Sequence, residues 1–488
     1  MKKYDLVVIG GGPAGTPVVM EFAKLNPEKK VLLVDAHGEL GGECLFDGCI
    51  PSKIMQITAK YIQQLRNLEE FGIVLESKHY RVAWEKIVAR KKSILSQRTA
   101  AAKETLLRLT NATLLKATAK FLDDKHLEVL KDDGSVEKIE FLKAVIATGS
   151  QPRELSYAGG ANEHIWTNED FFEKMELPES MSIIGGGAIA VEFAQILSLL
   201  GCKIKLFVRS NRILKNLEEE AASFIFQTLQ RNENIELIVN ATVEKISFEN
   251  EFSITYKQDG TLKVAESQRV LSAIGRVANV ASLELENTAV ELSNGSITTD
   301  KHLQTSNANI YANGDVVSGF PKFAHTSQYG AHTIAQNLFL EHNLLSVNFD
   351  KNSWVLFSEP NVAMAGISRA QADKRGIEVL VEKYAFSTDA KAQIEANDKG
   401  YLEFVVEKKS RKIIGITIVA YEANSIAGEA ALIVANELSL SDLISTIHPH
   451  PTLSESFTVL AKMMMGKIMQ EKLQKPFVKT LLKIERFL

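Results

Sequence analysis

Two cysteines five residues apart form the part of this sequence best suited to chemistry. Cys44 and Cys49 stand in the run GGECLFDGCIPSK, residues 41–53. Thiols this close can form a small disulphide ring. An unbroken helix would separate them by about 7.5 Å along its axis, whereas a disulphide requires Cα atoms within about 6.8 Å. A bend is therefore expected, which Gly48 permits, and because a short, bent disulphide is easily reduced, the pair is interpreted as a redox couple.

The composition agrees with this interpretation. The 488 residues include only three cysteines, whereas a secreted disulphide scaffold uses more, in even number. Cys202 begins an apolar segment and is expected to be a small buried side chain. The N-terminus lacks the composition of a signal peptide, and no apolar run reaches the about 18 residues of a membrane span. A cytoplasmic protein is predicted, and a net charge of −4 gives no indication of nucleic-acid binding.

A glycine-rich turn follows the first apolar strand of the chain. Gly10, Gly12 and Gly15 fit the dinucleotide-binding fingerprint, in which they serve the tight turn, the approach to a pyrophosphate and the packing of helix on strand. The helix predicted over residues 16–25 would direct its N-terminus at the phosphates. Asp35 ends the next strand, where an acid binds ribose hydroxyls. The pattern predicts a dinucleotide-binding fold.

The same pattern recurs in the middle of the chain with one change at its end. Arg209 stands where the first fold has its acid, and Lys215 follows. Because a cation there favours a ribose 2′-phosphate, NADP(H) is expected rather than NAD(H). A solvated surface position is the alternative for Arg209, and Arg212 is an alternative to Lys215. The three glycine positions of this second turn hold Gly185, Gly187 and Ala190.

Two dinucleotide folds imply two dinucleotides. Segments 144–149, 270–276 and 309–315 are each expected to return to the first fold, so the second fold would be inserted into the first. The fold class is therefore α/β, with two Rossmann-like dinucleotide-binding domains and a C-terminal α+β domain. The predicted domains are 1–153 with 274–345, then 154–273, then 346–465, followed by a basic amphipathic extension, 466–488.

Two histidines lie among prolines in the run IHPHPTLSE, residues 447–455. Glu455 lies five residues after His450, close enough to orient its imidazole and make it a stronger base. A pair of structural histidines is the alternative. Metal binding is a weaker one, because further ligands do not stand nearby in the sequence.

In this order the motifs resemble the FAD-dependent pyridine nucleotide-disulphide oxidoreductases, over about residues 4–465. The resemblance is strongest to dihydrolipoamide dehydrogenase, with glutathione-reductase-like features at the second nucleotide site. It implies FAD and NAD(P) as cofactors. Electrons would pass between nicotinamide, flavin, the cysteine pair and a small dithiol or disulphide, which includes a lipoyl group on a carrier domain.

The resemblance also implies roles for single residues. Cys49 would lie beside the flavin, Cys44 would exchange with the substrate, and Lys53 and Glu192 would form an ion pair near the flavin. The C-terminal domain would form a homodimer in which His450 serves the disulphide of the partner subunit. Further residues expected to contact FAD or NAD(P) are Gly42, Thr148, Gly149, Gly275, Arg276 and Asp315, the last at the ribityl chain.

The sequence departs from the family pattern at a few positions. Glu43 replaces the usual threonine and Phe46 the usual asparagine, which leaves the redox potential of the couple open. Dihydrolipoamide dehydrogenases normally use NAD, in conflict with Arg209. A dihydrolipoamide dehydrogenase-like enzyme is predicted. The alternatives are an NADPH-dependent reductase of another low-molecular-weight disulphide and a flavoprotein scaffold without turnover.

The C-terminal tail is rich in lysine and arginine. After Pro476, apolar residues recur at helical spacing, which predicts a basic amphipathic helix. Such a helix can bind an anionic membrane surface or a partner. Packing on the chain's own domain or dimer is the alternative.

Overall fold

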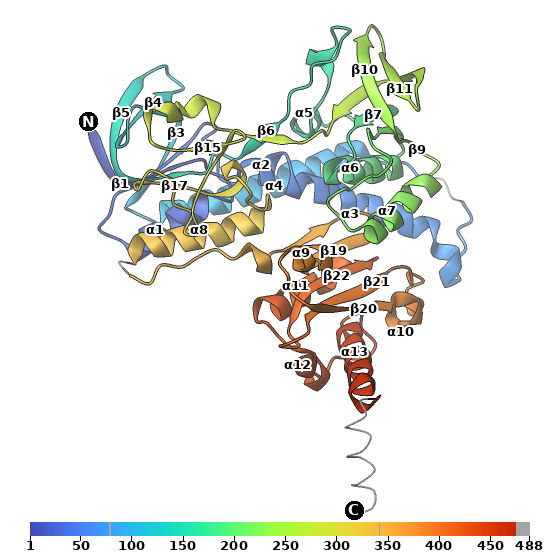
Figure 1. The fold of residues 1–488 in the computed structure, drawn as a ribbon. Helices are drawn as coiled ribbons and strands as arrows, with labels where there is room; N and C mark the ends of the chain where they lie inside the picture. The colour runs from blue at the N-terminus through green and yellow to red at the C-terminus, as the bar shows by residue number, and fades with distance from the viewer. Residues whose placement is uncertain (78–79, 341, 475–488) are drawn as a thin grey trace, which may run out of the picture. The chain divides into compact units, whose positions relative to one another are not determined.

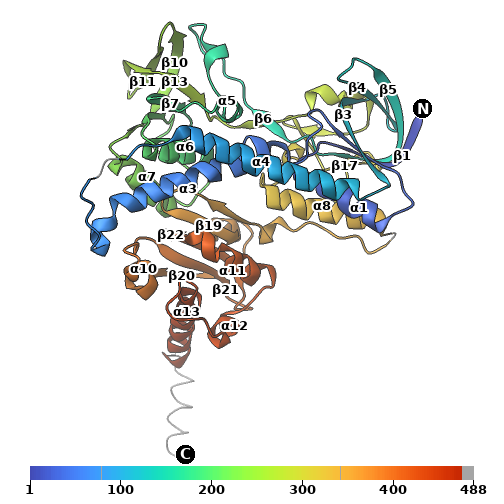
Figure 2. The same ribbon diagram turned by 180° about the vertical axis from the view of Figure 1, so that it is seen from behind.

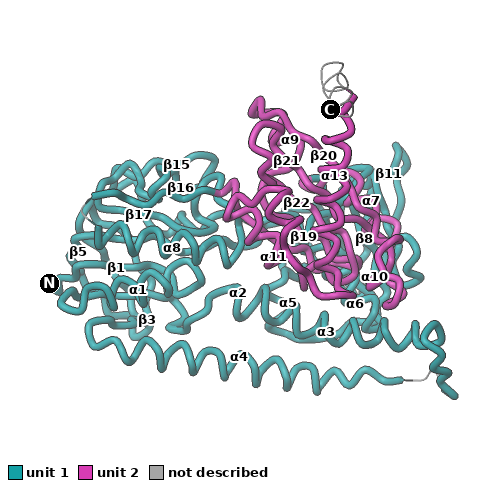
Figure 3. Tube along the Cα trace, turned by 90° about the horizontal axis from the view of Figure 1, so that it is seen from below, with its two compact units in different colours: residues 1–215, 229–348 teal, residues 216–228, 349–488 magenta. Residues whose placement is uncertain are grey.

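The computed structural model describes residues 1–77, 80–340 and 342–474. These residues fall into two compact units, shown in teal and magenta in Figure 3. Unit 1 comprises residues 1–215 and 229–348 and holds both glycine-rich turns, whereas unit 2 comprises 216–228 and the C-terminal part from 349. The finer division into three domains and an extension stays a prediction.

The first sheet of unit 1 is built around β1. The second half of this strand is buried on both faces, as in parallel sheets that are covered by helices (Figure 1). β1 pairs in parallel with β2 on one side and with β5 on the other, and β17 pairs in parallel with β5. Two of the three predicted returns, 144–149 and 309–315, are thus confirmed as parts of this sheet. Its strands are β1 (Lys2–Ile9), β2 (Val31–Asp35), β3 (Ala112–Phe121), β4 (His126–Lys131), β5 (Val136–Ile146) and β17 (Ile310–Ala312).

The second sheet corrects one sequence prediction. The strand near residue 270 was expected in the first fold, but it pairs in parallel with β7 in the second sheet. The apolar pattern of a strand does not record its partner, and this strand closes the second fold before the chain leaves it. The four strands lie in the order β13 (Arg269–Ser272), β7 (Ser180–Ile184), β8 (Lys203–Phe207) and β9 (Ile235–Ile238).

Short antiparallel sheets complete the strands of unit 1. The two connections between the nucleotide folds pair with each other as β6 (Ser150–Pro152) and β14 (Arg276–Ala278). This pairing places Ser150 and Arg276, which are far apart in the sequence, on neighbouring strands. The other antiparallel strands are β10 (Ala241–Phe248), β11 (Phe252–Gln258), β12 (Thr261–Ser267), β15 (Leu292–Ser293) and β16 (Ser296–Ile297).

Helices cover these sheets and carry the functional segments. The predicted helix over 16–25 is α1 (Thr16–Leu25), which packs its apolar face against β2 and α8. The two longest helices of unit 1, α3 and α4, lie side by side, as Figure 2 shows. The other helices that lie within unit 1 are α2 (Gly42–Phe46), α3 (Cys49–Arg66), α4 (Trp84–Leu107), α5 (Asn168–Lys174), α6 (Ala188–Leu199) and α8 (Ala324–Phe339). α7 (Glu219–Arg231) begins in unit 2 and ends in unit 1.

Unit 2 is an antiparallel sheet with helices packed on it. α13 (Glu455–Gln474) buries Phe457, Leu460 and Met464, whose spacing places them on one face of the helix, and Phe457 stacks on Phe404 of the sheet. The strands follow the order β18 (Ser353–Leu356), β19 (Asn361–Gly366), β22 (Ile413–Ala420), β21 (Tyr401–Glu407) and β20 (Val379–Ala385). The other helices are α9 (Arg369–Lys374), α10 (Ala390–Ile394), α11 (Ala423–Ala435) and α12 (Leu440–Ser445).

Across the three described ranges, no helix combines the length and the apolar content that crossing a membrane requires. The predicted amphipathic helix after Pro476 lies outside the described residues.

Candidate active site

The cysteine segment bends where the sequence predicts. α2, which carries Cys44, ends at Phe46, and α3 begins at Cys49. Gly48 precedes α3, and a Cβ added to it would lie 3.2 Å from the carbonyl oxygen of Glu43, so a side chain there would push on the turn. Ser52 locks the start of α3, since its hydroxyl donates to the Gly48 carbonyl at 2.7 Å. Both cysteines are free thiols, with Cys49 the more exposed.

The two thiols differ in acidity because they interact with each other. The hydrogen bond that Cys44 donates to Cys49 lowers the pKa of Cys49 to about 7, helped by the charge of Lys53, while burial acts in the opposite direction. The same hydrogen bond, together with burial and the charge of Glu43, raises the pKa of Cys44. Cys49 also begins a helix, where backbone N–H groups stabilise a thiolate. The reduced pair therefore holds its negative charge on Cys49.

We expect Cys49 to ionise near pH 7, below the pKa of about 8.5 of an ordinary thiol. Below pH 7 the thiol is protonated and reacts slowly, whereas above pH 7 the thiolate dominates. The check is the rate of iodoacetamide alkylation of Cys49 against pH in Cys44→Ser and Cys44→Ala proteins. Serine keeps a donor to the sulphur and should keep a midpoint near neutrality; alanine removes it and should raise the midpoint. Equal midpoints at or above about 8.5 would contradict the account.

The ion pair implied by the family resemblance is present. Lys53 lies one helical turn after Cys49 on α3, and its Nζ is 2.6 Å from Glu192 Oε2 on α6. Both side chains are largely buried, so each charge requires a partner. The pair links the cysteine helix α3 to α6, the helix after the second glycine turn, and places a cation near the thiols.

The first glycine turn is shaped for a ligand that approaches the backbone. A Cβ on Gly10 would lie 2.2 Å from the Ala147 carbonyl, and one on Gly15 would lie 2.0 Å from the Gly10 carbonyl, so neither position accepts a side chain. Gly12 faces Gly42: a Cβ on Gly12 would lie at an ordinary contact distance of 3.7 Å from Gly42 Cα, whereas one on Gly42 would lie only 2.7 Å from Gly12 Cα. Asp35 accepts from the Gly11 backbone N–H at 2.8 Å, which holds the acid beside the turn.

The helices after the two glycine turns lack anions of their own. α1 and α6 have no side-chain cap and no acid in the first turn, whereas α5, α9 and α12 each begin with a capping box that contains a hydroxyl. Their positive N-terminal ends remain available to phosphate groups. With the glycine cradle, these features fit a dinucleotide such as FAD at α1 and a second dinucleotide at α6.

The second glycine turn lies beside a loop that carries two exposed basic residues. Gly185 is closed to a side chain by the Ala273 carbonyl, whereas a Cβ on Gly187 would meet nothing within 4 Å, and Ala190 is buried. The Leu214 N–H donates to the Gly186 carbonyl at 2.7 Å and holds the loop after β8 beside the turn. This loop carries Arg209 and Lys215, and both side chains are exposed.

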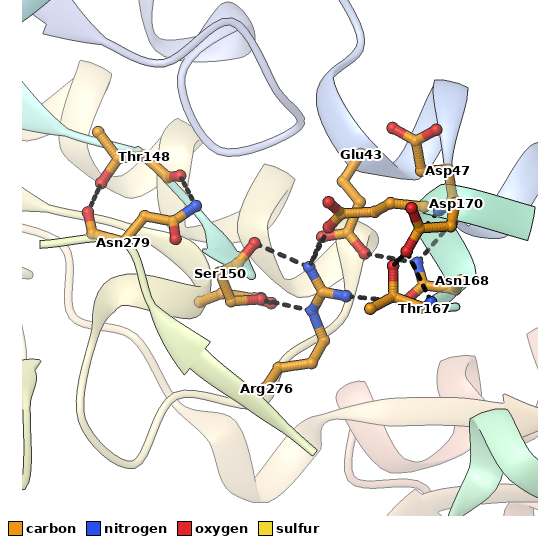
Figure 4. A network of polar contacts seen from close by, with 11 residues as sticks. Glu43, Asp47, Thr148, Ser150, Thr167, Asn168, Asp170, Arg276 and Asn279 are labelled. Atoms are coloured by element: carbon orange, nitrogen blue, oxygen red, sulfur yellow. Dashed lines mark hydrogen bonds and ion pairs between the residues drawn. The ribbon is translucent and has the colours of Figure 1, made fainter. Parts of the chain in front are cut away.

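A polar network joins the remaining predicted residues (Figure 4). Asp315 follows β17, and its Oδ2 accepts from the Ser150 hydroxyl at 2.7 Å. That hydroxyl in turn accepts from Arg276 Nε at 2.9 Å. Thr148 bonds to Asn279, while Gly149 and Gly275 adopt the positive φ values of 72° and 120° that favour glycine. The pairing of β6 with β14 brings these residues together.

The two histidines of unit 2 have different environments. The side chain of His448 is buried and contacts Glu429 at 2.6 Å and Thr458 at 2.8 Å. For this residue the contacts fit the alternative of a structural histidine. The His450 side chain is 72% exposed and its Nδ1 lies 2.9 Å from Glu455. The Thr452 N–H and His450 lower the pKa of Glu455, so it stays a carboxylate that orients the imidazole with Nε2 outward. His450 is thus the reactive candidate.

Two family models match consecutive parts of this chain. Residues 4–331 match the pyridine nucleotide-disulphide oxidoreductase family, and residues 352–461 match its dimerisation domain. The chain belongs to the pyridine nucleotide-disulphide oxidoreductase family. Dihydrolipoyl dehydrogenase of Geobacillus stearothermophilus is 31% identical over 95% of this chain and 96% of the relative. Dihydrolipoyl dehydrogenases of Bacillus subtilis and Staphylococcus aureus are 28% and 29% identical over 95% of this chain and 96% and 97% of theirs.

These matches confirm the predicted fold class and enzyme class. The oxidoreductase has two dinucleotide-binding folds and a dimerisation domain, and it is an FAD-dependent disulphide oxidoreductase of the dihydrolipoamide dehydrogenase type. A homodimer follows from the dimerisation domain. The matches do not extend to a preference for NADP(H).

Sequence reasoning missed two residues of the network that positions the oxidoreductase's cysteine turn, Asn168 and Ser150. Asn168 on α5 donates to the Asp47 carbonyl at 2.8 Å, and it accepts from Arg276 at 3.2 Å. Ser150 links Arg276 to Asp315. No spacing rule connects residues this distant; the only signal was the unusual acid, Glu43, which needed a partner.

Proposed function

We propose that this oxidoreductase transfers electrons between a pyridine nucleotide and a dihydrolipoyl or lipoyl group through Cys44 and Cys49. The observation that carries the proposal is the bent dithiol with one acidified thiol, beside the Lys53–Glu192 ion pair. The names of the full-length relatives support the substrate class. Small substrates and lipoyl groups on a carrier domain share this dithiol chemistry.

In this proposal, each residue has a limited task. Bound FAD supplies the hydride and electron chemistry. The glycine cradle and α1 would hold its pyrophosphate, Asp35 its ribose hydroxyls and Asp315 its ribityl chain. Cys49 holds the thiolate of the reduced pair, and Cys44 exchanges with the substrate disulphide. His450 of the partner subunit would accept or return a proton at Nε2 while Glu455 of that subunit fixes the ring.

The decisive test compares substrates at steady state. NADH and NADPH are each assayed with lipoamide, oxidised glutathione and a panel of other small disulphides, and NAD⁺ and NADP⁺ with dihydrolipoamide. We expect lipoamide to give the highest kcat/KM. A clear preference for another disulphide would replace the lipoyl proposal by the reductase alternative, which the exposed basic loop after β8 favours. Loss of turnover with every disulphide would remove both.

We further propose that Arg209, with Lys215, binds a 2′-phosphate and gives a preference for NADP(H). Replacing Arg209 by alanine should lower kcat/KM for NADPH by about tenfold to a hundredfold. This factor corresponds to the loss of one hydrogen bond to a charged group, which contributes about 1.5–3 kcal/mol. The rate with NADH should stay unchanged. Lys203→Ala is the matched control, since Lys203 is an exposed cation at the opposite end of β8. An equal loss with both nucleotides would contradict the preference.

Two predictions rest on the sequence. We propose a cytoplasmic location, which the low cysteine content supports. We also propose that the basic extension, residues 466–488, docks weakly on a membrane surface or a partner. Most of these residues lie outside the described part of the chain. Within the described part, Lys467 pairs with Glu382 of the same unit, which favours packing on the chain's own domain for that stretch.

A further inference from the structure

Glu43 is the residue of the active-site segment that the proposed function leaves without a role. It stands directly before Cys44 on α2. Its Oε2 lies 2.5 Å from Arg276 Nη2, and its side chain is only 33% exposed (Figure 4). A charged group that is largely removed from water beside a redox couple requires a reason.

The partners of Glu43 form a clamp on the cysteine turn. Arg276 is satisfied at every nitrogen, because it also donates to Ser150, Asn168 and Glu169. Asn168 is buried and holds the far end of the turn through the Asp47 carbonyl at 2.8 Å. The same guanidinium therefore fixes both ends of the segment that carries Cys44. Through Ser150, it also connects the segment to Asp315, which accepts from the Ser150 hydroxyl.

The charges around the segment have an unequal effect on the two thiols. The charge of Glu43 acts on Cys44 and disfavours its thiolate, with Arg98 of α4 opposing, while Lys53 favours the thiolate of Cys49. The groups facing Glu43 are Arg276, which favours its carboxylate, and Glu169, Asp315 and Asp47, which disfavour it. Burial and these acids raise the pKa of Glu43 to about 8, against the opposing charge of Arg276, so Glu43 carries its full negative charge only above that pH.

We propose that Glu43, held by Arg276 and Asn168, is a positioning residue that keeps the proton of the reduced pair on Cys44 and makes the disulphide harder to reduce. Reduction adds two electrons, breaks the Cys44–Cys49 bond, leaves a thiolate on Cys49 and binds one proton at Cys44. The pyridine nucleotide supplies the electrons. Above about pH 8, where Glu43 is a carboxylate, its charge opposes the added negative charge. This inference rests on the proposed role of the two cysteines as the redox couple.

The first experiment measures the acidity of Cys44 alone. In Cys49→Ser protein, the iodoacetamide alkylation rate of Cys44 is followed against pH with and without Glu43→Gln, which keeps the shape of the side chain and removes its charge. We expect the midpoint to fall and the rate at pH 9, where Glu43 is charged, to rise about threefold to tenfold. Glu169→Gln is the matched control: it removes a carboxylate from the same Arg276 but not one next to the cysteine, so it should change the rate much less.

The second experiment measures the redox equilibrium of the holoenzyme. At pH 9, where Glu43 is charged, Glu43→Gln should move the dithiol–disulphide midpoint potential to a more positive value by ~15–30 mV, which corresponds to a threefold to tenfold change for a two-electron couple. Glu43→Asp, which restores the charge, should return it towards the original value. Bound flavin and the thermal midpoint of unfolding report whether the variants are folded.

The outcomes separate this inference from the proposed function. If oxidised lipoamide fails to consume the two thiols of the reduced, unsubstituted enzyme, the redox couple itself is wrong. If the couple titrates but Glu43→Gln changes neither the alkylation profile nor the potential in folded protein, the role of Glu43 is overturned. A change equal to that of Glu169→Gln would also overturn it, because the effect would then belong to Arg276.

Discussion

Replacement of Cys44 or of Cys49 by serine should lower the rate of disulphide reduction by at least about a thousandfold, as expected when a covalent nucleophile is lost. A lone thiol can attack a disulphide once, but it cannot release itself by forming the intramolecular bridge. The third cysteine, Cys202, is fully buried at the start of β8, and burial raises its pKa to about 12, so it cannot take over. The measurement is NADPH- or NADH-dependent reduction of lipoamide.

The control for this prediction is Cys202→Ser, which should retain the original rate. Each variant should also keep its bound flavin, because neither Cys44 nor Cys49 is part of the glycine cradle. Turnover of lipoamide at the original rate by either active-site variant would show that electrons leave the enzyme by another route.

The second large effect is expected at His450. Replacing it by glutamine should lower kcat for lipoamide by about a hundredfold to ten-thousandfold, the usual contribution of a positioned acid or base. Its imidazole is exposed and oriented by Glu455, as a group that transfers protons to a substrate must be. Glu455→Gln should cause a smaller loss in the same direction, since the ring remains but its orientation is no longer held by a charge.

His448→Gln tests whether the effect belongs to His450. His448 is buried against Glu429 and Thr458, so its replacement should lower the thermal midpoint while folded enzyme keeps most of its kcat. The pH profile of kcat provides a second measurement, because only the His450 variant should lose a limb of the profile. The opposite assignment, with His448 as the sensitive residue, would contradict the geometry.

The sequence predicted those features of the fold that neighbouring residues determine, such as the bounds of a helix and the position of a bend. The bounds of α1 followed from the glycine turn before it, and the bend between the cysteines followed from the reach of a disulphide. The partner of β13 did not follow, since an apolar strand fits the edge of either sheet. In the sequence, His450 is distinguished from His448 by its distance from Glu455 and by the family resemblance; the structure adds that His448 is buried and His450 exposed. The environment of Glu43 depends on Arg276, which no periodicity connects to it.

The contact between Glu43 and Arg276 has a consequence for biosynthesis. The two residues are 233 positions apart, so the cysteine turn gains this partner only after more than half of the chain has left the ribosome. Chains are made from the N-terminus, and early segments fold first. Both thiols are therefore translated long before the clamp that fixes them exists, and the nascent enzyme must pass through a period in which its cysteines are still unclamped.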